Sequence, residues 1–274
     1  MISLALAVVM LVACGSTPSP SPPRTFGGDR PVDLQVPAVL QSGRRFPLII
    51  VLHAYGSTGV DQTSYFGLMD EAVDDNAFVL APDGMTDSTG NQFWNADATC
   101  CDVDHTNPDD VGYLAKLIQQ VTAVWPIDRG AVAVIGHANG GTMAYRLACE
   151  RADLVSNLIV FAAPTPSTAC APTQPVNVLH IFGTSDPSVP YSMAGTSMQQ
   201  WAVNDHCGAT RRPGPTQDVD STLPGNETLT ESMAGCPAGT EVDLWTIEGG
   251  GHMPTLATTF GPAMRNWVIT HRRS

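Results

Sequence analysis

The stretch that decides the fold runs from Val132 to Glu150 and reads VAVIGHANGGTMAYRLACE. Its first four residues are apolar and mostly β-branched, which predicts a buried strand. Residues 141–150 carry the apolar spacing of a helix. The five residues between them, GHANG at 136–140, leave space only for a sharp turn, where glycine avoids a clash between a side chain and the neighbouring backbone. The stretch therefore predicts a strand, a tight turn and a helix.

The rest of the chain alternates between apolar runs and helical patterns, which is typical of a mostly parallel sheet with helices on both faces. The expected strands are 47–53, 78–81, 132–135, 158–162, 176–182 and 242–247. The further expected helices are 107–124, with Asn107 as N-cap and Pro108 in the first turn, and 258–270. A length of 274 residues suits one α/β domain better than two.

The tight turn resembles the nucleophile elbow of the α/β-hydrolase fold, G-x-S-x-G, with Ala138 where the serine is expected. Two further positions complete the chain order nucleophile, acid, histidine that this fold uses. Asp186 comes directly after strand 176–182, where a carboxylate could orient an imidazole. His252 lies in a glycine-rich loop after strand 242–247, from which its ring could approach the elbow. Ala138, Asp186 and His252 are therefore the candidate catalytic positions.

Other polar residues near these strands have simpler interpretations. Asp110 is an alternative acid, although its place near a helix N-terminus accounts for a carboxylate through the helix dipole. Three histidines, His53, His137 and His180, lie on or beside strands, and we expect them to be structural.

A nucleophile at such an elbow also needs backbone N–H groups aimed at the developing oxyanion. We expect one from Asn139, which follows the nucleophile position at the start of a helix, and one from Tyr55 in the loop after the first strand. Trp94 is a candidate for lining an acyl pocket, the alternative being a core position.

Six segments resemble the secreted poly(3-hydroxybutyrate) depolymerase-like esterases, a family that includes feruloyl and acetylxylan esterases. They are 47–56, 94–96, 109–114, 136–150, 183–191 and 249–252. The resemblance implies ester hydrolysis through an acyl-enzyme, with no cofactor and no metal. It implies a small ester, a short polyester or a feruloylated glycan as substrate. The chain departs from the family pattern at Ala138, at Ala54 in the oxyanion loop and at Met253-Pro254 after the histidine.

Ala138 leaves three hypotheses open. In the first, the chain is an engineered serine esterase whose serine was changed to trap a complex, because the acid, the base and the oxyanion loop persist. In the second, it is a natural pseudoenzyme that binds esters or glycans without cleaving them. In the third, His252 activates water in the space left by the hydroxyl, which gives residual hydrolysis.

The N-terminus has the pattern of an export signal. Residues 2–12 are apolar but too short to span a bilayer, and Leu11-Val12-Ala13-Cys14 resembles the lipobox of bacterial lipoproteins. We therefore expect residues 1–14 to be a signal peptide and lipobox, with Cys14 lipidated on the outer face of a bacterial membrane. The alternative is an ordinary secretory signal. Residues 15–29, rich in Ser and Pro, predict a flexible tether, and residues 30–274 the hydrolase domain.

The cysteine count fits an oxidising compartment. Without Cys14, six of the seven cysteines remain, enough for three disulfides. Cys207 and Cys236 flank an insertion and are expected to pair. The pairing among Cys100, Cys101, Cys149 and Cys170 stays open, and a bond between the adjacent Cys100 and Cys101 would be strained. A metal site in the segment 100–105 (CCDVDH) is the competing interpretation, disfavoured because no second paired-ligand cluster accompanies it.

The net charge of the chain limits the kinds of molecule that it can bind. The formal net charge of -13 disfavours nucleic acid and anionic membrane surfaces, which need clustered Lys and Arg. We expect a monomer that touches a membrane only through its lipid anchor and that acts on a neutral or cationic small substrate.

Overall fold

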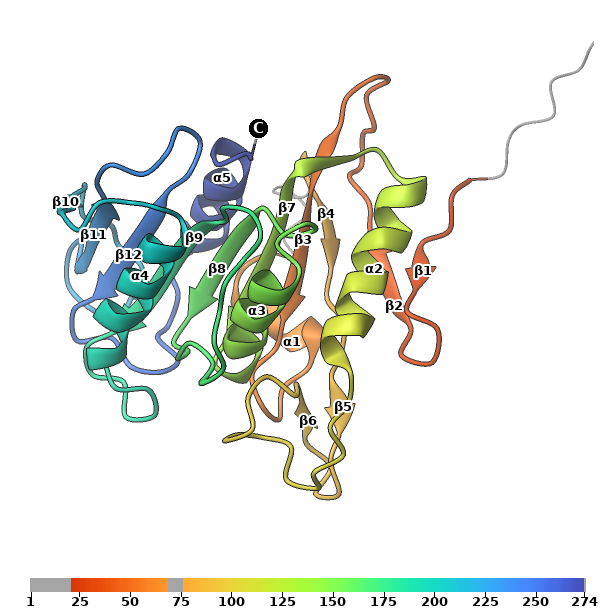
Figure 1. The fold of residues 1–274 in the computed structure, drawn as a ribbon, viewed down its shortest axis with the longest axis horizontal. Helices are drawn as coiled ribbons and strands as arrows, with labels where there is room; N and C mark the ends of the chain where they lie inside the picture. The colour runs from red at the N-terminus through yellow and green to blue at the C-terminus, as the bar shows by residue number, and fades with distance from the viewer. Residues whose placement is uncertain (1–20, 69–75, 274) are drawn as a thin grey trace, which may run out of the picture.

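The computed structural model describes residues 21–68 and 76–273, and ten of the strands in this part form one sheet in the order β1-β2-β4-β3-β7-β8-β9-β12-β11-β10 (Figure 1). These strands are β1 (Thr25–Phe26), β2 (Val32–Gln35), β3 (Phe46–Leu52), β4 (Phe78–Leu80), β7 (Ile127–His137), β8 (Asn157–Phe161), β9 (Asn177–Gly183), β10 (Arg211–Pro213), β11 (Thr228–Met233) and β12 (Val242–Ile247). A small hairpin adds β5 (Met85–Thr86) and β6 (Gln92–Phe93). The helices are α1 (Gly59–Tyr65), α2 (Asp110–Val124), α3 (Asn139–Glu150), α4 (Ser192–Asn204) and α5 (Phe260–Thr270).

The centre of the sheet is parallel and buried on both faces. Strands β4, β3, β7, β8, β9 and β12 pair in parallel, and the pairs nearer the two edges are antiparallel. Along β3, Leu48 and Ile50 pack into the core beneath α2, α3 and α4, whereas Ile49 and Val51 pack into the core beneath α5. This alternation follows from the two-residue period of a strand. Figure 1 shows α2, α3 and α4 side by side across one face.

The predicted fold class, an α/β-hydrolase fold with a mostly parallel sheet, is confirmed. The strand 242–247 matches β12, and the strand before the elbow is longer than predicted, since β7 begins at Ile127. The predicted N-cap Asn107 is wrong: the Asp109 side chain accepts the hydrogen bond of the Gly112 N–H at 2.8 Å and caps α2. Asn107 takes a left-handed backbone, φ 47°, in the loop before the helix.

The predicted tether boundary at residue 29 is also wrong. Thr25 and Phe26 form β1 against β2, and Phe26 is buried. The main-chain oxygens of Pro23 and Arg24 accept hydrogen bonds from Trp125 Nε1 at 2.8 Å and from the Leu34 N–H at 2.7 Å. Composition alone misplaced this boundary, because a short edge strand carries little apolar signal. The predicted signal peptide and Cys14 lie outside the described residues.

Among residues 21–68 and 76–273, no helix has the length and apolar character needed to cross a bilayer.

Three disulfides join the cysteines of the domain. Cys207 is bonded to Cys236, the pairing expected from the sequence, and Cys149 to Cys170. The adjacent Cys100 and Cys101 are bonded as well, a pairing that the sequence disfavoured. Cys101 adopts a left-handed φ of 81° in this turn.

The alternative interpretation of segment 100–105 was a metal site, but its cysteines and carboxylates have other partners in the structure. The sulfur atoms of Cys100 and Cys101 are bonded to each other, so neither is a thiolate ligand. Asp102 accepts hydrogen bonds from Thr106 and Asn107, and Asp104 accepts two from Ser88.

Candidate active site

The sharp turn after β7 brings Ala138 to the carboxyl edge of the sheet. Ala138 has φ 49° and ψ −116°, a conformation that a residue with a side chain rarely adopts. Its N–H donates to the main-chain oxygen of Phe161 at 3.0 Å, and its own oxygen accepts from the Thr142 N–H at 2.9 Å. The strained backbone of a nucleophile elbow is therefore present although the residue at its tip is alanine.

Glycine is required on both sides of Ala138 because backbone segments meet there. A Cβ placed on Gly136 would lie 2.2 Å from the oxygen of Gly140, and one placed on Gly140 would lie 2.4 Å from the oxygen of Leu52. Both separations are far inside van der Waals contact. The G-x-A-x-G spacing is thus a packing requirement of β3, β7 and α3.

Asp186 and His252 come together at the same edge. The loops after β9 and β12 carry them, and these strands are neighbours in the sheet. His252 Nδ1 lies 2.8 Å from Asp186 Oδ2, and the Asp186 side chain is fully buried. Asp186 Oδ1 accepts hydrogen bonds from the N–H groups of Ser188 at 2.7 Å and Val189 at 2.9 Å, which fix the carboxylate. With Nδ1 engaged, Nε2 is the imidazole nitrogen left for proton transfer.

Two aromatic residues support the His252 loop from the side of the core. His137 Nε2 lies 3.0 Å from the main-chain oxygen of His252, and the two imidazole rings are 5.0 Å apart. Burial, with the neighbouring His252, lowers the pKa of His137 to about 4, so its ring is neutral and Nε2–H donates this bond. The Tyr65 hydroxyl donates to the oxygen of Pro254 at 2.9 Å, and its ring stacks on His137.

The two residues expected to supply oxyanion N–H groups, Tyr55 and Asn139, line one cavity together with Ala138 and His252. Asn139 is the first residue of α3, and the N–H groups in the first turn of a helix have no acceptor within the helix. Its side chain is held by the main chain of Trp94: Oδ1 accepts from the Trp94 N–H at 2.8 Å and Nδ2 donates to the Trp94 oxygen at 2.9 Å. The Tyr55 hydroxyl donates to Asp87 at 2.6 Å.

Trp94 does not line the cavity, which corrects the expectation of an acyl-pocket residue. Its side chain is fully buried and packs 5.1 Å from the ring of His53. The strand β6 that leads to it points the ring into the core, the alternative that the sequence left open. Its contribution to the site is the main-chain contact with Asn139.

The cavity has a volume of about 690 Å³. One wall is the loop of Ala96 to Cys101, another is Pro164 to Ser167, and Val189 and Met193 complete it. Asp97 joins the two loops, since Oδ1 accepts from Thr99 and Oδ2 accepts from the N–H and hydroxyl of Ser167, both at 2.6 Å. Burial opposes ionisation of Asp97, but these four hydrogen bonds hold its pKa below the ordinary value.

Sequence reasoning missed Asp97 and Met193 as cavity residues. The only local signal for Asp97 was the D-x-T pattern at 97–99, typical of an aspartate that accepts from its own backbone two residues on. Nothing in the sequence connected it to Ser167, because that contact spans 70 residues.

The other polar residues that the sequence singled out are engaged elsewhere. His53 bridges the Ala54 oxygen and the Gly84 N–H, and burial lowers its pKa. His180 is hydrogen-bonded to the Tyr145 hydroxyl, and burial lowers its pKa to about 3. Asp110, the alternative acid, is paired with Arg30 at 2.7 Å and accepts from the Asn95 N–H at 2.8 Å.

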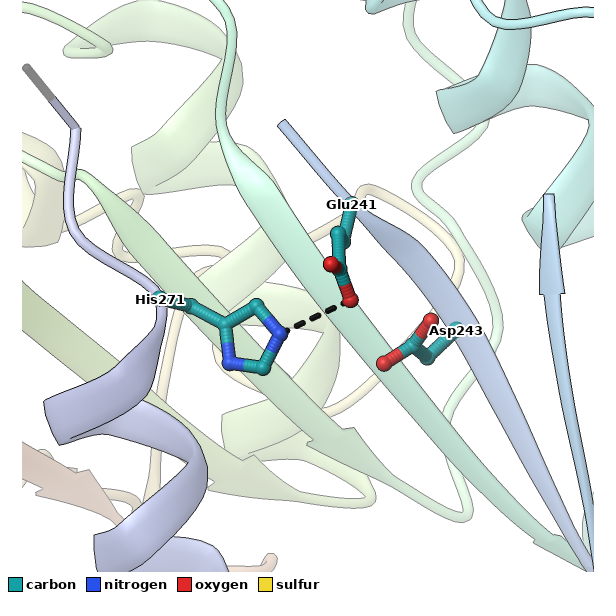
Figure 2. A group of neighbouring side chains, drawn as sticks. All are labelled: Glu241, Asp243 and His271. Atoms are coloured by element: carbon teal, nitrogen blue, oxygen red, sulfur yellow. Dashed lines mark hydrogen bonds and ion pairs between the residues drawn. The ribbon is translucent and has the colours of Figure 1, made fainter. Parts of the chain in front are cut away.

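One group of potential metal ligands lies far from this cavity, at the opposite end of β12. Figure 2 shows His271 pointing toward Glu241, with His271 Nε2 2.9 Å from Glu241 Oε2 and Asp243 beside them. β12 separates them from the His252 loop by about 20 Å at 3.3 Å per residue. Trp267 of α5 contacts two of these three residues: its Nε1–H donates to Asp243 at 2.9 Å, and its ring stacks on that of His271 with the ring centres 4.2 Å apart. These contacts fasten α5 to the sheet.

A tight strand-to-helix turn with an Asp–His pair behind it, on a mostly parallel sheet, is the arrangement of α/β-hydrolases. The family described as "Putative esterase" matches residues 24–233. The chain therefore belongs to this esterase family.

The relatives of this chain include feruloyl esterases. The chain is 27% identical over 241 residues to feruloyl esterase B of Piromyces equi, covering 81% of this chain and 42% of that protein. It is 25% identical over 240 residues to feruloyl esterase D of Neurospora crassa, covering 84% of this chain and 76% of that protein. The chain thus spans less than half the length of the first of these relatives.

Solved structures support the fold. An acetyl xylan esterase from Aspergillus awamori superposes with a TM-score of 0.62 at 14% identity, over 87% of this chain and 93% of that one. A ferulic acid esterase from Anaeromyces mucronatus, solved with ferulic acid, gives a TM-score of 0.51 at 14% identity, over 88% of this chain and 85% of that one.

Proposed function

We propose that this chain has a serine-esterase-type site from which only the nucleophile is missing, so that it binds carboxylic esters and hydrolyses them at no more than a residual rate. Ala138 occupies the nucleophile position, His252 is the base, Asp186 orients it, and the N–H groups of Tyr55 and Asn139 form the oxyanion hole. The observation that carries the proposal is the elbow backbone of Ala138, φ 49° and ψ −116°, beside an Asp186–His252 pair at 2.8 Å. Residues held in rarely populated backbone conformations cluster at functional sites, which supports the proposal.

The mechanism that we propose follows from the absence of a hydroxyl oxygen at residue 138. In a serine esterase the hydroxyl oxygen attacks the ester carbonyl while the histidine takes its proton, and the alcohol leaves from an acyl-enzyme. Ala138 has no atom that can form this bond. His252 can still take a proton from water, so direct hydrolysis is the only route left, aided by the oxyanion N–H groups.

The test is the Ala138→Ser variant with p-nitrophenyl acetate as substrate. We expect a gain in kcat of at least about 10³-fold over the parent chain, because removal of a triad member costs this much or more. Ala138→Ser combined with His252→Ala is the matched control and should stay at the parent rate. The proposal fails if Ala138→Ser gains nothing on short aryl, acetyl and feruloyl esters.

A natural pseudoenzyme is the second candidate. The cavity of about 690 Å³ favours it, because it is formed in a chain that lacks the nucleophile. Affinity for an ester or a feruloylated glycan in the parent chain, without any gain of turnover in Ala138→Ser, would support this candidate over the first.

The substrate that we propose is a small ester, a short polyester or a feruloylated glycan, with no cofactor and no metal in the reaction. The names of the relatives, which act on feruloyl and xylan esters, support this class. The net charge of -13 argues against nucleic acid as a partner.

We also propose export, with a lipid on Cys14 as the membrane anchor and a monomeric domain outside the cell. Three disulfides support an oxidising compartment. Expression of the full chain in a bacterium that processes lipoproteins tests the anchor. Cys14→Ala should move the protein from the membrane fraction to the soluble fraction, and an unchanged distribution would refute the lipid.

A further inference from the structure

The disulfide between Cys100 and Cys101 is part of the cavity wall. Both residues line the cavity that also contains Ala138 and His252. Cys100 is exposed and Cys101 is half-buried, so this part of the wall can contact a bound molecule. The mechanism derived above uses neither of them.

The loop that carries the disulfide is fixed on both sides. Before it, Asp97 is hydrogen-bonded to Thr99 and across the cavity wall to Ser167, and the Cys100 N–H donates to the Asp97 oxygen at 3.3 Å. After it, the Asp102 carboxylate accepts from the Thr106 N–H at 2.9 Å and the Asn107 N–H at 2.7 Å. The sulfur atoms are therefore presented from a constrained backbone.

A bond between neighbouring residues restricts the side chains further. It closes a small ring that includes their shared peptide group, so neither side chain can change rotamer independently. The result is a rigid, polarizable, apolar surface, unlike a flexible side chain that must be ordered on binding. Sulfur makes favourable contacts with aromatic rings, and Met193, a second sulfur-containing residue type, lines the same cavity.

We propose that the Cys100–Cys101 disulfide determines acyl specificity by packing its sulfur atoms against a planar aromatic ring in the acyl group of the bound ester. This inference rests on the proposed function, since it requires that the cavity takes carboxylic esters. The prolines at 164 and 166 form a second rigid wall of the same cavity.

The experiment measures binding, so that it does not depend on turnover. Isothermal titration of the parent chain compares methyl cinnamate with methyl 3-cyclohexylpropanoate, which has a saturated ring on the same three-carbon acyl chain. The Cys100→Ser/Cys101→Ser variant should weaken binding of methyl cinnamate by about 3- to 10-fold, which lies within the roughly 2- to 13-fold that sulfur–aromatic contacts are worth, and leave the saturated ester within about 2-fold. Cys149→Ser/Cys170→Ser, which removes a disulfide outside the cavity, is the control and should keep the parent preference.

Each outcome separates the two claims. An unchanged preference in folded Cys100→Ser/Cys101→Ser overturns the role of the disulfide but not ester binding. If the parent chain binds neither ester, both claims fail. If binding persists while Ala138→Ser shows no turnover, only the esterase part of the proposed function fails.

If Cys100→Ser/Cys101→Ser does not fold, a second measurement on the parent chain tests the same proposal. A water-soluble phosphine reduces the exposed disulfide of the parent chain to two thiols and is itself oxidised to the phosphine oxide. With the thiols located by mass spectrometry, opening of Cys100–Cys101 alone should lower the preference for the aromatic ester in the same way. A preference that survives this opening refutes the proposal.

Discussion

His137 donates a hydrogen bond from Nε2 to the main-chain oxygen of His252 at 3.0 Å, and the two imidazole rings lie 5.0 Å apart. The residue before Ala138 thus holds the loop of the candidate base, so the elbow and the His252 loop are connected through one neutral imidazole. Burial keeps that imidazole neutral, with a pKa of about 4.

Replacing His137 should therefore displace His252. In the Ala138→Ser background, His137→Phe keeps an aromatic ring but removes the donor, and we expect kcat to fall by about 10- to 100-fold, since small misplacements of a catalytic group have effects of this size. Steady-state kinetics on p-nitrophenyl acetate measure the fall. A variant with the parent kcat would show that the bond does not position His252.

Asp186 should contribute through orientation. In the same background, Asp186→Asn retains the shape of the side chain but favours the wrong imidazole tautomer, and kcat should drop by about 10⁴-fold. Asp110→Asn is the comparison, because Asp110 is the alternative acid and is paired with Arg30 instead. Equal losses of kcat in the two folded variants would contradict the assignment of Asp186.

The side chain of Asn139 holds the start of α3 against Trp94 through two buried hydrogen bonds. Asn139→Ala leaves the Trp94 N–H and oxygen without these partners and should lower the free energy of unfolding by roughly 1–3 kcal/mol. Urea unfolding of the parent chain and the variant measures this change. A difference below about 0.5 kcal/mol would mean that water replaces the side chain without cost.

Stability should depend on pH through Asp205. Burial raises the pKa of Asp205 to about 7, and its one hydrogen bond, from the Val176 N–H at 3.0 Å, does not offset this. A carboxyl whose pKa is higher in the folded state stabilises fully below its unfolded pKa, near 4, and loses that contribution as pH rises toward 7.

The matched variant is Asp205→Asn, which does not titrate. The stability of the parent chain relative to Asp205→Asn should fall by up to about 1.4 kcal/mol per pH unit between pH 4 and 7. Urea unfolding at several pH values gives this difference and cancels the opposite effect of the buried histidines. A difference that is flat with pH would show that Asp205 does not carry this titration.

Prediction from the sequence worked where a local pattern has one physical meaning. The run before Gly136 could only be a buried strand, and glycines at 136 and 140 are needed because backbone meets backbone there. Asp186 and His252 were expected at one edge because each follows a strand of a parallel sheet, and the structure places Asp186 Oδ2 2.8 Å from His252 Nδ1.

Prediction from the sequence failed where the role of a residue depends on contacts with residues far away in the chain. The ring of Trp94 is as apolar in a core as in a pocket, and only the packing against His53 decides between them. The edge strand β1 is two residues long, so it has no period to detect. The bond between Cys100 and Cys101 occurs in a turn where Cys101 has a left-handed backbone, and no residue pattern predicts that turn.

The strained turn at Ala138 has a genetic consequence. Every alanine codon becomes a serine codon by the same single base change, G to T at the first position. The turn already holds the dihedral angles of an elbow, φ 49° and ψ −116°, so the new hydroxyl would need no accompanying change in the backbone. A gene encoding this chain is thus one point mutation from a serine at the tip of its elbow, and selection for growth on an ester could find that revertant in a single step.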